Sequence, residues 1–271
     1  HSLLATQVIS RIRDTFDLEL PLRHFFESPT IAALNEQLNT ARHQSAVPPI
    51  RPINRDKQLP LSFAQQRLWF FNQLEGPSPT YNVPLALRLE GQLQQNALEQ
   101  SLQALVQRHE NLRTAFPTVN GIATIQISEQ PFQLDIIDLR AFSPEEQAIK
   151  VQQLVKENVS YLFDLETGPL FRAVLLQLRV ESHVLLLNMH HIISDEWSHG
   201  ILVREWRTFY EAFLQGKPSP LSPLPIQYVD FAQWQRQWLT GVVLEQQVAY
   251  WKQQLEGAPA LLEMPTDYPR Q

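Results

Sequence analysis

A proline-rich stretch divides this sequence into two parts. Residues 43–60 (HQSAVPPIRPINRDKQLP) contain four prolines and show neither helical nor strand periodicity. Proline fixes φ and lacks the N–H group that helices and central strands require, so this stretch predicts an extended connector that does not pass through a core. We place the connector at residues 43–58, between a smaller region, 1–42, and a larger one, 59–271.

The region before the connector has the pattern of a small all-α unit. Apolar residues recur at about one helical turn over residues 2–16, which predicts an amphipathic helix. Residues 28–30 (SPT) then precede a second apolar run. Because Ser, Thr and Pro are typical of the first positions of a helix, a further helix is expected to begin there.

The region after the connector alternates between strand and helix patterns. Leu85, Leu87 and Leu89 take every second position, which predicts a half-buried strand. Residues 170–180 and 183–192 predict two apolar strands that form an antiparallel hairpin. Between them and the first strand, Asn96 and Glu99 indicate the capping box of a helix. The larger region is therefore predicted to be mixed α/β.

Composition excludes several classes of protein. Lys and Arg total 22 against 28 Asp and Glu, for a net charge of −6, without the basic excess of nucleic-acid-binding proteins. The absence of cysteine excludes disulfides, thiolate metal sites and cysteine nucleophiles. No apolar run approaches the about 20 residues that span a bilayer, and no secretory signal is evident. We expect a cytoplasmic protein without nucleic-acid or membrane partners.

The densest polar cluster lies in residues 189–199 (MHHIISDEWSH), where an apolar strand pattern gives way to a helix pattern. Neighbouring side chains of a strand point to opposite faces, so His190 and His191 cannot serve the same site. This argues against a metal held by both, and no metal is expected. Asp195 and Glu196 also have an ordinary interpretation as acids at a helix start, where the helix dipole favours them by about 0.3–1 kcal/mol each.

Four segments resemble the first four core motifs of nonribosomal peptide synthetase condensation domains, in the same order and spacing: 62–69 (SFAQQRLW), 108–116 (RHENLRTAF), 190–195 (HHIISD) and 228–235 (YVDFAQWQ). The resemblance implies an α/β fold like that of chloramphenicol acetyltransferase. It implies that residues 59–271 are the N-terminal lobe and that the C-terminal lobe is missing. Donor and acceptor peptidyl carrier domains, the C-terminal lobe and an adjacent adenylation domain are the implied partners.

The first residues resemble the end of the GGHSL signature of a peptidyl carrier protein. The serine of that signature carries 4'-phosphopantetheine, so the resemblance implies Ser2 as the site of the covalent cofactor. Residues 1–42 are then the C-terminal part of a small helical carrier domain. Without the preceding glycines, a plain helix N-cap is the other interpretation of Ser2.

The implied reaction joins a carrier-bound aminoacyl or peptidyl thioester to the α-amine of a carrier-bound acceptor. The pKa of an α-amine is ~7.7–8.0, so part of the amine is already neutral near pH 7, and a strong base is hardly needed to deprotonate it. We expect His191 to orient the reactants, stabilise charge and accept a proton. His190, counted with it in the catalytic set, is expected to hydrogen-bond within the lobe, and Asp195 to form a structural ion pair with Arg113.

Glu196 departs from the family pattern, which has glycine after the motif aspartate. A dehydrating subgroup resembles this chain in having glutamate there. Conversion of a donor Ser or Thr to a dehydroamino acid requires removal of an α-proton and protonation of the leaving hydroxyl, so His191 and Glu196 are expected to act together. An epimerisation domain, a non-catalytic carrier-docking fragment and a coenzyme A-dependent acyltransferase remain alternatives. The chain alone is expected to be inactive.

Overall fold

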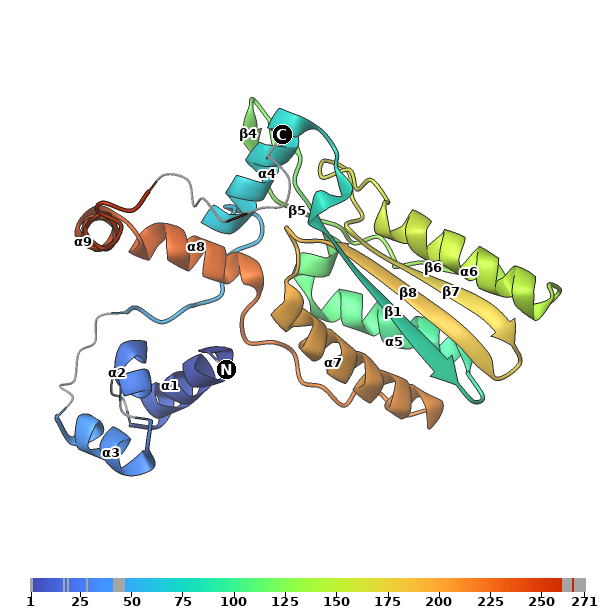
Figure 1. Cartoon of the computed structure of the whole chain (residues 1–271), viewed down its shortest axis with the longest axis horizontal. Helices are drawn as coiled ribbons and strands as arrows, with labels where there is room; N and C mark the ends of the chain where they lie inside the picture. Colours follow the sequence, from blue (N-terminus) through green and yellow to red (C-terminus); the bar gives the residue numbers. More distant parts are fainter. Residues whose placement is uncertain are drawn as a thin grey trace. The chain divides into compact units, whose positions relative to one another are not determined.

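The chain divides into two compact units, His1–Pro49 and Ile50–Gln271. The computed structural model describes residues 2–16, 18, 20–27, 29–40, 47–259 and 265 (Figure 1). The division lies inside the predicted connector. The second half of that connector, from Ile50 onwards, belongs to the larger unit.

The smaller unit is helical throughout its described part, with α1 (Ser2–Phe16), α2 (Leu22–Glu27) and α3 (Ile31–Thr40). The predicted start of α3 is confirmed, because the Thr30 hydroxyl accepts a hydrogen bond from the N–H of Ala33 at 3.2 Å. Ala5 and Leu20 are buried. Other apolar residues of the helical period, such as Phe16, are exposed. Within its described residues, this unit therefore buries only part of the apolar face of α1.

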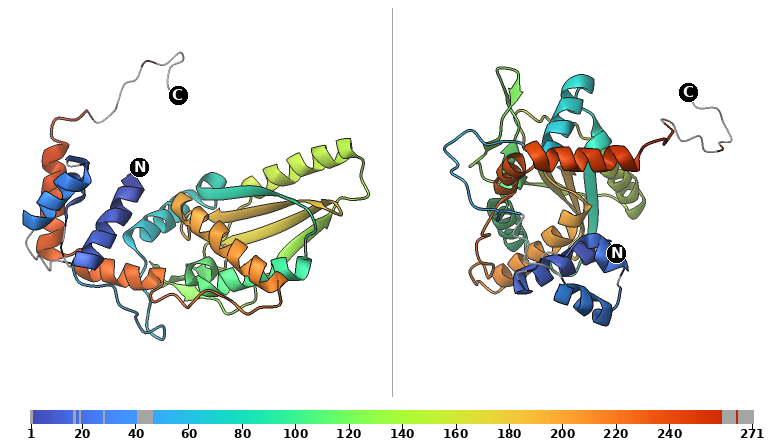
Figure 2. Two further views of the ribbon diagram at one scale, coloured as in Figure 1. Left: turned by 90° about the horizontal axis from the view of Figure 1, so that it is seen from below. Right: turned by 90° about the vertical axis from the view of Figure 1, so that its left-hand side faces the viewer.

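The core of the larger unit is a four-stranded sheet in the order β1-β8-β7-β6 (Figure 2). Its strands are β1 (Asn82–Glu90), β6 (Leu134–Asp138), β7 (Phe171–Arg179) and β8 (Ser182–His190). Strand β8 runs antiparallel to β1 and β7, and β6 runs parallel to β7. The predicted hairpin, β7–β8, is confirmed, and β8 is an inner strand of the sheet.

Helices cover both faces of this sheet (Figure 1). Helices α5 (Gln95–Arg108) and α7 (Glu196–Leu214) pack on one face, and α6 (Pro144–Val159) packs on the other. Along β8, Leu185 and Leu187 join the cluster under α5 and α7, whereas Leu186 joins the cluster under α6. An inner strand covered on both sides must be apolar on both faces, which explains the continuous apolar run in its sequence.

Most of the remaining elements lie near the end of the sheet where β8 finishes, and the last helix lies beyond them, away from the sheet (Figure 1). The remaining elements are α4 (Phe63–Glu75), η1 (Pro79–Tyr81), η2 (Glu110–Arg113), α8 (Tyr228–Trp238), α9 (Gly241–Gln254) and two short ribbons, β2 (Thr114–Ala115) with β5 (Gln126–Ile127) and β3 (Thr118–Val119) with β4 (Ile122–Ala123). One predicted cap is wrong. Helix α5 has Gln94 at its N-cap without a side-chain cap, so Asn96 lies inside the helix, and Glu99 accepts a hydrogen bond from Gln95 instead.

Candidate active site

The two adjacent histidines lie where β8 ends. His190 is the last residue of β8 and pairs with Asn82 of β1, and a turn over residues 191–193 then leads towards α7. The main-chain N–H of His191 donates to the carbonyl oxygen of Tyr81 at 2.8 Å. The side chain of His190 is only 3% exposed, whereas that of His191 is exposed. The two imidazoles therefore occupy different surroundings, as strand geometry predicts.

The His190 side chain is built into the turn. Its Nδ1 accepts a hydrogen bond from the N–H of Ile192 at 3.1 Å, and its ring lies near the rings of Tyr81 and Phe163. Burial, followed by the charge of His191, lowers the pKa of His190 to about 4. A neutral imidazole is therefore present near pH 7, and it can accept this bond without placing a charge in the core.

Asp195 does not form the predicted ion pair with Arg113. It is the N-cap of α7, and its Oδ1 accepts hydrogen bonds from the N–H and the hydroxyl of Ser198 at 2.8 and 2.5 Å. Arg113 donates instead to the carbonyl oxygen of Ser128 and to Glu129, each at 2.9 Å. An acid that begins a helix has local N–H partners within three residues, and here these partners take the place of the distant cation.

Glu196 is the first residue of α7, and its side chain is exposed. The pKa of His199, one helical turn further on, shows which charges share this region. Burial lowers that pKa most, Asp195 and Glu196 raise it, and His191 lowers it. The two acids and the two histidines therefore lie within electrostatic range of one another. Among the described residues, Glu196 makes no hydrogen bond or ion pair that would tie its carboxylate down.

The other motifs meet beneath this turn. Asn111 of the second motif donates from Nδ2 to the carbonyl oxygen of Ile193 at 2.6 Å. The buried Gln65 of the first motif reaches the carbonyl oxygen of Ile192 and Oδ1 of Asn111, both at 3.4 Å. The fourth motif contacts the first through the hydroxyls of Tyr228 and Ser62, which lie 3.1 Å apart. Three segments distant in sequence thus form one hydrogen-bonded support for residues 191–193.

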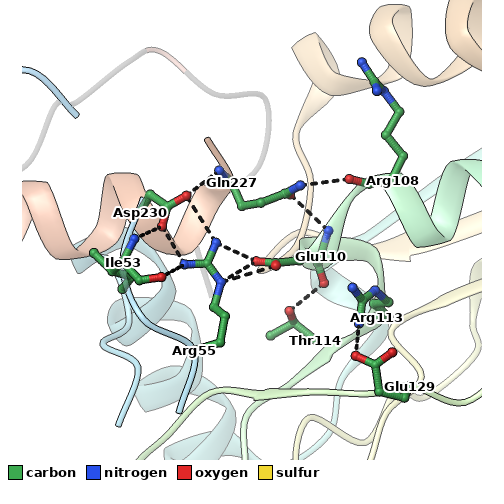
Figure 3. Close-up of polar contacts among 9 residues, drawn as sticks. All are labelled: Ile53, Arg55, Arg108, Glu110, Arg113, Thr114, Glu129, Gln227 and Asp230. Carbon is green, nitrogen blue, oxygen red and sulfur yellow. Dashed lines mark hydrogen bonds and ion pairs between the residues drawn. The ribbon is translucent and has the colours of Figure 1, made fainter. Parts of the chain in front are cut away.

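An arginine of the connector bridges the second and fourth motifs (Figure 3). Arg55 binds both oxygens of Asp230 in α8 and both oxygens of Glu110 in η2. Gln227 adds a second bridge, because it donates to the carbonyl oxygen of Arg108 and accepts from the N–H of Glu110. Sequence reasoning missed these contacts. The available signal was that Arg108, Glu110 and Asp230 lie in the recognised motifs.

The described residues bear on both metal binding and membrane insertion. No set of three or more His, Asp or Glu side chains there is arranged to hold a metal ion. No helix among the described residues is long and apolar enough to cross a bilayer.

Comparison with known protein families decides what this arrangement belongs to. A family model described as the condensation domain matches residues 55–271. The chain belongs to the condensation-domain family. A second model, described as the phosphopantetheine attachment site, matches residues 1–38. A carrier region followed by a condensation domain is therefore confirmed, as is the predicted mixed α/β fold.

The relatives of this condensation domain are nonribosomal peptide synthetases. It is 49% identical over 276 residues to malpinin synthetase of Mortierella alpina, with 100% of this chain and 4% of the relative covered. It is 41% identical over 275 residues to a dimodular nonribosomal peptide synthase of Bacillus subtilis (strain 168), with 100% and 11% covered. The chain thus spans a small fraction of each of these synthetases.

Solved structures share the fold of this condensation domain. The X-domain in its complex with OxyB from teicoplanin biosynthesis aligns with a TM-score of 0.73 and 27% identity, covering 83% of this chain and 49% of that one. The starter condensation domain of rhizomide synthetase RzmA aligns with a TM-score of 0.67 and 20% identity, covering 75% and 49%, and shows the fold alone. The chain spans about half the length of these structures.

The match over residues 1–38 indicates covalent phosphopantetheine in the carrier region. Helix α1 begins at Ser2 and has no acidic residue in its first turn. The first turn of a helix offers main-chain N–H groups and the positive end of the helix dipole, which suit a phosphodiester. The described backbone therefore fits the cofactor that the family match indicates.

Proposed function

We propose that this condensation domain forms a peptide bond between two carrier-bound substrates. The α-amine of the acceptor attacks the thioester carbonyl of the donor, a C–N bond forms, the C–S bond breaks, and the proton lost by the amine balances the departing thiolate. One observation carries this proposal. His191 presents an exposed imidazole at the end of an inner strand, on a turn whose main chain is held by Tyr81 and Asn111.

His191 acts on the amine and on the charge that develops during attack. An α-amine with a pKa of ~7.7–8.0 is already partly neutral near pH 7, so the imidazole needs to orient it and accept one proton. A positioned general base contributes about 10²- to 10⁴-fold to the rate. His190 supports this role from below: it is buried, neutral and hydrogen-bonded to Ile192, so its ring fixes the turn and does not touch substrate.

The remaining site residues and partners follow from this arrangement. Asp195 positions the turn by capping α7. Donor and acceptor carrier domains supply the substrates, and a second lobe completes the walls around His191, with an adenylation domain as a further neighbour. Support for a second lobe comes from the solved relatives, about half of whose length this chain covers.

Ser2 is the proposed attachment residue for 4'-phosphopantetheine. When bound, this group carries an acyl chain as a thioester. The start of α1 holds the phosphodiester of this group, and the first-turn N–H groups stabilise its negative charge.

Dehydration of a donor Ser or Thr is a second candidate activity. It is favoured by the position of Glu196, an exposed carboxylate at the start of α7 that shares the electrostatic surroundings of His191 and His199. One group would take the α-proton and the other would protonate the leaving hydroxyl, so that water departs and a C=C bond forms. Without Glu196, only one proton-transfer side chain of this pair is present.

Reconstitution of the full-length synthetase tests both candidates. Donor and acceptor carriers loaded with seryl and aminoacyl thioesters are combined, and the acyl groups on each carrier are followed by intact mass. Transfer of the donor to the acceptor carrier supports condensation, and loss of water from the donor supports dehydration. Exchange of the donor α-proton without transfer would assign epimerisation instead, and an unchanged donor on a folded enzyme would leave carrier docking as the function.

A further inference from the structure

We infer that Asn111 is a positioning residue for His191, acting through the main chain of the turn. This inference rests on the proposed function of His191. Asn111 lies in η2, 82 residues away from the turn in sequence, and its side-chain amide donates to the carbonyl oxygen of Ile193 at 2.6 Å. That bond is shorter than the contacts that Gln65 makes with the same turn.

The orientation of the Asn111 amide is fixed by a second partner. Nε2 of Gln65 lies 3.4 Å from Oδ1 of Asn111, and Gln65 is itself held by a reciprocal capping box with Ser62. Gln65 is 2% exposed and Ser62 is fully buried, so neither side chain has water as an alternative partner. A flipped Asn111 would place its oxygen against the Ile193 carbonyl and its nitrogen against the Gln65 donor. The amide therefore has one satisfactory orientation.

The turn over residues 191–193 needs a hydrogen bond to its main chain, because its buried side chains fix only part of its backbone geometry. Ile192 and Ile193 are each 3% exposed and anchor the turn in the main core. The N–H of Ile193 bonds to the carbonyl oxygen of His190, and that of His191 bonds to Tyr81. The carbonyl oxygen of Ile193 takes part in neither of these bonds, and it accepts the hydrogen bond from the Asn111 amide. Without Asn111, the peptide after Ile193 can rotate and move the backbone that carries His191.

A small displacement there has a large effect on rate. Misplacement of a catalytic group by about 1 Å costs on the order of 10²-fold, because the reacting atoms leave the attack geometry. We therefore expect Asn111→Asp to lower kcat for peptide-bond formation about ten- to a hundredfold, with little change in the KM for the acceptor carrier. This substitution keeps Oδ1 for Gln65 and replaces only the donor that faces Ile193.

The matched control is Gln147→Glu. Gln147 is a buried side chain of α6, on the opposite face of the sheet, and its amide donates to the carbonyl oxygens of Leu139 and Leu178 at 3.0 and 2.9 Å. Gln147→Glu therefore makes the same chemical change on the opposite face of the sheet: a carboxylate replaces an amide that donates to main-chain carbonyl oxygens. Asn111→Ala is the second variant, because it removes both bonds without adding a charge and serves if the aspartate variant does not fold.

The experiment measures kcat and the KM for the acceptor carrier in the full-length synthetase for these variants, alone and combined with His191→Ala. If Asn111 acts through His191, its substitution lowers kcat in the wild-type background and has no further effect once His191 is gone. Equal losses in both backgrounds, or an equal loss of kcat in Gln147→Glu, would overturn the inference and leave Asn111 a general structural residue. A His191→Ala enzyme with wild-type kcat would refute the proposed function itself, which is a separate outcome.

Discussion

The guanidinium of Arg55 and the carboxylate of Asp230 meet through two hydrogen bonds, 2.6 Å from Nη1 to Oδ1 and 3.1 Å from Nη2 to Oδ2. Burial raises the pKa of Asp230, but the bonds from Arg55 and from the N–H groups of Gln227 and Ile53 outweigh it, so the net shift is downward. The pair is therefore ionised at neutral pH. This ion pair links the C-terminal end of the connector to the fourth motif.

Replacement of Arg55 by alanine is expected to destabilise the larger unit strongly. Asp230 has a side chain only 1% exposed, and it would keep its charge without a cation. Removal of one partner of a buried ion pair costs about 3 kcal/mol, the lower end of the usual range, because Arg55 is itself 29% exposed. Urea unfolding measures the change. The control is Arg88→Ala, which breaks the exposed pair with Glu90 and should leave stability unchanged; equal effects of the two substitutions would contradict the assignment.

Acid is expected to destabilise the domain through His190. Its pKa is about 4 in the folded chain, against the ordinary value of 6.5. Between these pH values the unfolded chain binds a proton that the folded chain does not, so the free energy of unfolding falls as the pH falls from 6.5 to 4, by about 3 kcal/mol. The burial-lowered pKa values of His183 and His199 act in the same direction.

The measurement is urea unfolding of the wild type and of His190→Asn at several pH values. Asparagine keeps an acceptor for the Ile192 N–H but does not titrate, so the variant should lose much of the slope between pH 4 and 6.5. Parallel curves for the two proteins would show that His190 does not resist protonation in the folded state.

Asp195 is expected to matter for stability as a helix cap and not as an ion-pair partner. Asp195→Ala should cost about 1 kcal/mol and Asp195→Asn much less, because asparagine keeps the capping oxygen. In a double-mutant cycle with Arg113→Ala, the two free-energy changes should add, since Arg113 binds Glu129. A coupling energy well above experimental error would restore the ion pair that the structure replaces.

Glu196 is expected to control loss of water from a seryl donor. Glu196→Gly in the full-length synthetase should slow dehydration by about 10²-fold or more, because one of two proton-transfer groups is lost, while peptide-bond formation should continue. Glu145→Gly, which removes an exposed acid from the first turn of α6, is the matched control. Intact mass of the donor carrier gives the answer: unchanged loss of water in Glu196→Gly rejects the dehydrating role.

Much of the fold could be predicted because periodicity is a local signal. Alternating apolar residues predicted β1, and its burial pattern alternates accordingly. The apolar runs of β7 and β8 predicted two strands that form a hairpin. In the structure both are inner strands, which explains why both of their faces are apolar. The strand rule also predicted that His190 and His191 differ in their surroundings, and the first is buried while the second is exposed.

The polar support of the site could not be predicted because its partners are distant in sequence. Asn111 and Ile193 are 82 residues apart, and Arg55 and Asp230 are 175 apart. Neither pair leaves a periodic pattern. The incorrect pairing of Asp195 with Arg113 has the same origin, because the N–H of Ser198, a local partner, competes with a distant cation for the Asp195 carboxylate, and only the structure shows which contact forms. At α5, Asn96 offered a plausible cap, but the helix begins before it.

The central claim is that the exposed imidazole of His191 promotes peptide-bond formation. The most direct test compares single-turnover transfer from donor to acceptor carrier in the full-length synthetase for the wild type, His191→Ala and His183→Gln, the last being a histidine at the opposite end of the same strand. We predict that His191→Ala slows transfer about 10²- to 10⁴-fold while His183→Gln leaves it nearly unchanged. Transfer by His191→Ala within about threefold of the wild-type rate would contradict the account.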